Sequence, residues 1–94
     1  MNMNDPTYYR AIWADVMARA IRDTEAGTDV EREATLDWIF NGNRQAINSF
    51  EAVCTWCGFA PDGARQRLLQ RDQFRSCFDR WPAADKTRDE RAAA

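Results

Sequence analysis

The clearest pattern in the chain is a helical stripe of apolar residues near its start. Between residues 9 and 21, apolar side chains recur at alternating intervals of three and one, which places them on one face of an α-helix. These positions are Tyr9, Ile12, Trp13, Val16, Met17, Ala20 and Ile21. Pro6 suits the first helical turn, and Gly27 suits the position just past the end. The pattern predicts a helix from Pro6 to Glu25 that buries this stripe.

A second helix is predicted after residue 27. Thr28 and Glu31 have the spacing of a capping box, in which each side chain accepts a hydrogen bond from the other residue's backbone amide. Residues 36–40 are too densely apolar for a helix with one exposed face, so this end is expected to enter the core. Asn41 and Gly42 are typical of a turn, and residues 41–48 are expected to form a loop or a short turn.

The segment 49–70 predicts two helices joined by a tight turn. Asn48 or Ser49 can cap the first helix, and Gly58 ends it. Pro61 then opens the second. The inward-facing positions are Phe50, Val53, Cys54 and Cys57 on the first helix and Ala64 and Leu68 on the second. This order is typical of a helix-turn-helix pair.

Apolar residues after this pair indicate a fifth helix or a continuation of the fourth, which Pro82 stops. They are Phe74, Cys77, Phe78 and Trp81. Residues 82–94 carry charges and alanines without an apolar stripe, so a disordered tail is expected there. The sequence has no internal repeat and no strand-like alternation. It predicts one all-α domain over residues 1–81, a small bundle of four to five helices.

The composition excludes several kinds of chemistry. Histidine is absent, which removes the commonest general base and metal ligand. Cys54 and Cys57 lie at the carboxyl end of their helix, where the helix dipole disfavours a thiolate. Together with Cys77 they supply only three of the four ligands that zinc usually takes. The cysteines are therefore interpreted as packing residues, and no metal, cofactor or enzymatic activity is expected.

No secretion signal or membrane-spanning stretch is recognisable, so a cytoplasmic protein with reduced thiols is expected. The net charge is −2 and is unevenly distributed. Residues 1–60 carry nine acidic side chains and five arginines, whereas residues 61–94 carry eight basic and six acidic side chains. Nearly all of the positive charge is guanidinium, which suits recognition of phosphates and carboxylates.

The helix-turn-helix pattern leads to a first functional hypothesis, that the protein is a phage or mobile-element regulator that binds DNA as a dimer. Arginine and glutamine side chains read base edges and bind phosphates. The expected contacts are Arg65, Gln66, Arg67, Gln70 and Arg71. Against this hypothesis, Asp62 lies at the helix tip that would meet DNA, and the whole domain is acidic.

The segment "LDWIFNGNRQAINSFEAVCTWCGFAPDGARQRLL" is similar to a family of small, largely uncharacterised helical proteins of phages, prophages and bacterial genomes. The similarity covers about residues 9 to 70. It is carried by Trp13, Trp38, Ile39, Phe40, Phe50, Val53, Cys54, Gly58, Pro61 and Arg65. Cys57 stands where the family usually has leucine, which fits a packing role. The resemblance implies a phage or mobile-element setting and no assigned activity.

A second hypothesis is that the protein binds another protein, as phage proteins do when they occupy a host protein. Tryptophan and arginine dominate interface hot spots, so Trp56 and Trp81 are the candidate anchors. The charge asymmetry favours DNA and the acidic net charge favours a protein partner. Both hypotheses remain open at the level of sequence.

Overall fold

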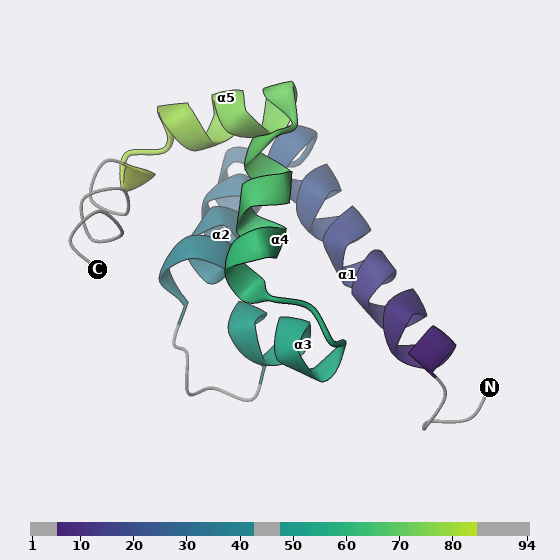
Figure 1. Cartoon of the computed structure of the whole chain (residues 1–94). Coiled ribbons are helices and arrows are strands. Elements are labelled where there is room, and N and C mark those ends of the chain that lie inside the picture. Colours follow the sequence, from purple (N-terminus) through teal and green to yellow (C-terminus); the bar gives the residue numbers. More distant parts are fainter. Residues whose placement is uncertain (1–5, 43–47, 85–94) are drawn as a thin grey trace.

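The computed structural model describes residues 6–42 and 48–84, which form five α-helices (Figure 1). Within these ranges there is no strand, and the predicted all-α class is confirmed. The helices are α1 (Pro6–Glu25), α2 (Asp29–Asn41), α3 (Phe50–Trp56), α4 (Pro61–Leu69) and α5 (Asp72–Arg80). The predicted loop falls partly on residues 43–47, outside the described part of the chain.

The junction between α1 and α2 has the capping box that the sequence predicts. The Thr28 hydroxyl accepts a hydrogen bond from the Glu31 amide at 3.2 Å, and Glu31 Oε1 accepts one from the Thr28 amide at 3.1 Å. The two bonds satisfy amides that a helix start otherwise leaves unpaired. α2 then runs back beside α1 (Figure 1).

The connection from α3 to α4 has the predicted chemistry. The Ser49 hydroxyl caps α3 by accepting a hydrogen bond from the Ala52 amide at 3.1 Å. Gly58 has a φ of 83°, a left-handed conformation that side chains other than glycine rarely adopt. The Phe59 amide donates to the Cys54 carbonyl at 2.8 Å, and Pro61 opens α4. A short helix, a glycine turn and a second helix therefore follow one another as in a helix-turn-helix pair.

α5 is a separate helix that begins after a turn at residues 70–71 and crosses the end of the bundle (Figure 1). Its buried aromatic rings meet the end of α2. The Phe40 ring lies 4.7 Å from that of Phe78 and 6.2 Å from that of Trp81, centroid to centroid. Trp81 is only 7% exposed, so its prediction as an interaction anchor is wrong. It belongs to the core because α5 directs it onto α2.

Two further expectations need correction. Ile12 was placed in the buried stripe of α1 but is 39% exposed, whereas Thr24, one turn beyond the stripe, is fully buried. The domain boundary predicted at residue 81 is too early, since Ala84 is 1% exposed and its amide donates to the Trp81 carbonyl at 3.0 Å. The domain extends at least to Ala84. The remainder of the predicted tail, residues 85–94, lies outside the described residues.

Candidate functional site

Arg65, a predicted DNA contact, does not lie on the protein surface. It is 4% exposed, although the DNA hypothesis requires it to face solvent. Its Nε donates to the Ile39 carbonyl at 2.8 Å, and its terminal nitrogens donate to Glu51 at 2.8 Å and Asp62 at 2.9 Å. These bonds join α4 to α2 and α3. Arg65 is therefore a structural residue, and its role as a surface contact is excluded.

A second property of Arg65 explains why a charge is tolerated at this depth. Its guanidinium carbon lies 5.0 Å from the centroid of the Phe50 ring, and its donors meet a carbonyl and two carboxylates. A buried charge is acceptable only when it is paired and hydrogen-bonded in this way. The same pairing compensates the charge of Asp62 at the tip of α4.

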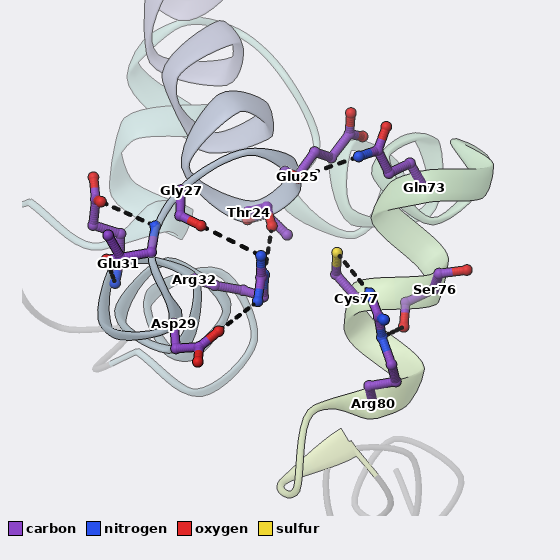
Figure 2. Close-up of polar contacts among 11 residues, drawn as sticks. Thr24, Glu25, Gly27, Asp29, Glu31, Arg32, Gln73, Ser76, Cys77 and Arg80 are labelled. Carbon is purple, nitrogen blue, oxygen red and sulfur yellow. Dashed lines mark hydrogen bonds and ion pairs between the residues drawn. The ribbon is translucent and has the colours of Figure 1, made fainter.

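Arg71 is exposed but is bound to α1. Its Nε and one terminal nitrogen donate to the two carboxylate oxygens of Glu25 at 2.8 and 2.9 Å. Gln73 Nε2 adds a hydrogen bond to the Glu25 carbonyl at 3.2 Å (Figure 2). The hydrogen bond from Arg71 is the main reason why the pKa of Glu25 is lowered, and the same bond raises the pKa of Arg71. This bidentate ion pair connects the α4–α5 turn to the end of α1.

The three other predicted contacts, Gln66, Arg67 and Gln70, are exposed as expected. They lie on two flanks of α4. Gln66 and Gln70 line a shallow groove of about 430 Å³ together with Leu69, Asp72 and Arg75. Arg67 lines a different pocket, toward α1. The five predicted contacts therefore do not form one surface.

The pocket beside Arg67 is built around two stacked aromatic rings. The Trp13 ring of α1 and the Phe59 ring of the α3–α4 connection lie 4.0 Å apart, with an angle of 19° between their planes. The cavity beside them measures about 200 Å³, and Ala60, Gly63, Ala64 and Arg67 complete its lining. We call it the Trp13–Phe59 pocket. Its lining residues come from α1, the connection and the first two turns of α4.

Two exposed apolar side chains are close to the rings of this pocket along the chain. Among the described residues, the large apolar side chains that are exposed are Ile12 at 39%, Trp56 at 63% and Val30 at 78%. Ile12 directly precedes Trp13, and Trp56 precedes Phe59 by three residues. Ile12 and Trp56 are therefore close to the stacked rings along the chain. We call Ile12, Trp56 and the pocket together the Trp56 surface.

The sequence points to Trp56 but gives little sign of the pocket. Trp13 is predicted to face the core, and Phe59 belongs to a turn, where no periodicity assigns it a face. The one local sign is the series of small residues Ala60, Gly63 and Ala64, which leaves one side of α4 without bulk. Only the stacking of Trp13 on Phe59, 46 positions apart, turns this series into a cavity wall.

The cysteines show no features of a reactive site. Cys54 is buried in the core, as predicted, while Cys57 is only half-buried. Burial raises the pKa of both thiols, so they stay protonated at neutral pH. Across the described ranges, no three His, Cys, Asp or Glu side chains are grouped closely enough to hold a metal ion.

A larger groove of about 440 Å³ lies between α2 and α5, and the arginine on each side of it bonds to groups on its own side (Figure 2). Arg32 donates to the carbonyls of Thr24 and Gly27 and to Asp29, which fixes the α1–α2 junction. Arg80 donates to its own helix at the Ser76 carbonyl. Arg32, the better buried of the two guanidinium groups, is thus occupied by structural bonds, and the groove offers no nucleophile paired with a base.

Within the described part of the chain, no helix is long and apolar enough to cross a lipid bilayer. No protein-family model, curated protein or solved structure matches the chain.

Proposed function

We propose that this protein is a non-enzymatic binding domain that engages another protein through the Trp56 surface. The observation that carries the proposal is Trp56, 63% exposed at the last position of α3 and three residues before Phe59, whose ring stacks on Trp13 to form the wall of a pocket. Tryptophan is enriched among the residues that contribute most to protein interfaces. Because the resemblance points to phage proteins, a host protein is the first class of partner to test.

The arginines support a protein partner over a nucleic acid. DNA affinity depends on basic side chains that are available to phosphates. Arg65 is enclosed, and Arg71 is held by Glu25 at 2.8 Å. Arg75 lies 3.8 Å from Asp79. With a net charge of −2, the domain has few cations left for a phosphate backbone.

The test is affinity capture from nuclease-treated lysate of the cells that encode the protein. The wild-type chain is compared with Trp56→Ser and Ile12→Ser, and Val30→Ser is the matched control. Val30 is more exposed than either and lies in the first turn of α2, beyond the far end of α1. All three substitutions remove exposed apolar area, so the folded state should tolerate each of them.

We expect a protein that is captured by the wild-type chain and by Val30→Ser, and is lost with Trp56→Ser and weakened with Ile12→Ser. Equal capture by all four chains would contradict the proposal. The test also covers a second copy of the chain as the partner. Sedimentation of the purified protein would reveal it as a dimer that Trp56→Ser dissociates.

DNA binding through α4 is the second candidate, and the exposed row of Gln66 and Gln70 behind the Gly58 turn favours it. A mobility-shift assay on promoter fragments at two salt concentrations tests it, with Gln66→Ala and Arg67→Gln as variants. DNA binding predicts a shift that weakens steeply as salt rises and is reduced in both variants. No shift at low salt would remove this candidate. Arg65→Glu is unsuitable as a variant because it would break the core network.

A further inference from the structure

We infer that the Trp13–Phe59 pocket receives one large apolar side chain of the partner, and that Arg67 pairs with a carboxylate beside it on the same partner segment. This inference rests on the proposed protein-binding function and specifies the chemistry of the ligand. The partner would present an apolar residue next to an aspartate, a glutamate or a free carboxyl terminus.

The size of the pocket indicates a single side chain. Its volume is about 200 Å³, below the range of about 300–1,000 Å³ typical of sites for drug-sized ligands. Its apolar wall is the Trp13–Phe59 stack, and Ala60 and Ala64 contribute only methyl groups. Such a cavity suits an aliphatic or aromatic group rather than a hydrated polar one.

Gly63 keeps the pocket open. A Cβ atom added there would meet only the Ala60 Cβ, at 3.8 Å, which is ordinary contact. Of the described glycines, only Gly58 has a positive φ, so the backbone at Gly63 does not require glycine. Glycine is also unfavourable inside a helix. The effect of glycine at this position is therefore the space that it leaves beside the aromatic rings.

Arg67 supplies the charge. It makes no ion pair and no side-chain hydrogen bond with the residues that the structure describes, although Arg65 and Arg71 on either side of it are both paired. A guanidinium at the rim of an apolar pocket favours a carboxylate, which it can bind through two parallel hydrogen bonds. The apolar wall and the single cation together define the partner's chemistry.

The experiment uses 3-phenylpropionate as the ligand and 3-phenylpropylamine as its cationic counterpart. Both are titrated into the ¹⁵N-labelled full chain while the indole and amide resonances are followed. We expect saturable shifts of the Trp13 indole and of the amides of residues 59–67. The carboxylate should bind about two- to fivefold more tightly than the amine, as for a partly exposed ion pair.

Two variants separate the parts of the site. Arg67→Gln should abolish the preference for the carboxylate while the pocket still binds. Gly63→Leu should fill the pocket and abolish binding of both compounds, with a melting temperature equal to or above that of the wild type. A lower melting temperature would be checked with Gly63→Ala, which should keep the fold and reduce binding less.

Equal binding of acid and amine by the wild type, shifts elsewhere in the protein, or full binding by a folded Gly63→Leu chain would each overturn the inference. The proposed function has a separate outcome. If neither compound binds but Trp56→Ser still abolishes protein capture, the pocket inference fails and the protein-binding proposal stands. If the compounds bind but protein capture does not depend on Trp56, the pocket's preference for an apolar carboxylate stands and the proposal that the Trp56 surface binds a protein fails.

Discussion

Two aromatic clusters of similar composition differ in how far they are buried in this fold. At the end of α5, Trp81 packs with Phe40 and Phe78 and is 7% exposed. The turn that follows buries Ala84 as well. At the other cluster, Trp13 stacks on Phe59, but both rings are only half-buried and line a pocket. The difference teaches that the packing of the neighbouring helices, more than the aromatic residues themselves, decides whether such a cluster is buried or partly exposed.

Two arginines of α4, Arg65 and Arg67, show the same difference between a buried and an exposed side chain. Arg65 is enclosed by groups from α2 and α3, whereas Arg67 lies at the rim of the pocket. A rotation of about 200° along the helix separates their side chains. One arginine therefore stabilises the fold, and the other is available to a partner.

The largest expected effect lies in the closed cluster. Phe78→Ala should lower the free energy of unfolding by about 3–5 kcal/mol, because it leaves a cavity between Phe40 and Trp81. Trp56→Ala should change it by less than about 0.5 kcal/mol, since that ring is largely in water. Urea unfolding of both variants measures the difference. Similar losses in the two would contradict the burial of Phe78 and the exposure of Trp56.

The next effect compares the two arginines. Arg65→Ala should cost about 3 kcal/mol, because the Ile39 carbonyl and the Glu51 carboxylate lose their donor in a buried setting. Arg67→Ala should stay within about 0.5 kcal/mol. Thermal melts of the two variants are sufficient to compare them. A mild loss at Arg65 would contradict its assignment to the core.

A smaller effect on the free energy of unfolding is expected from removing the two residues that follow Pro82. A chain that ends at Pro82 should be less stable than one that ends at Ala84 by about 1 kcal/mol, since it lacks the buried Ala84 methyl and its hydrogen bond to Trp81. Both shortened chains lack residues 85–94. The difference between their free energies of unfolding therefore isolates the contribution of Ala83 and Ala84. Equal stability would mean that the domain ends before residue 83.

The smallest effect concerns pH. The Arg71 hydrogen bond lowers the pKa of Glu25 in the folded state. The pair therefore stabilises the fold above the unfolded pKa of about 4.3, and this contribution is lost as pH falls through the lowered folded value. Glu25→Gln should flatten this part of the curve of unfolding free energy against pH. The effect is small because Arg71 is half exposed and solvent screens the pair.

Much of the fold follows from local signals in the sequence. Thr28 with Glu31, Gly58 and Pro61 set helix ends through hydrogen bonds and backbone angles within a few residues, and all of them are found where expected. The apolar spacing likewise identified the buried face of α5.

The candidate site was harder to predict because it depends on distant contacts. Arg65 is buried by the Ile39 carbonyl, 26 positions away, and Arg71 is held by Glu25, 46 positions away. Neither contact leaves a periodic trace in the sequence. Trp56 and Trp81 both follow a run of inward-facing residues, so only the packing of α5 on α2 separates the exposed ring from the buried one.

The most direct test of the protein-binding surface is site-specific photo-crosslinking in the cells that encode the protein. A benzophenone amino acid replaces Ile12, which directly precedes Trp13 of the pocket wall, or Val30, the more exposed control. The account predicts a discrete protein adduct from position 12 that disappears when Trp56→Ser is added, and none from position 30. Adducts of equal yield from both positions, or an adduct at position 12 that survives Trp56→Ser, would contradict it.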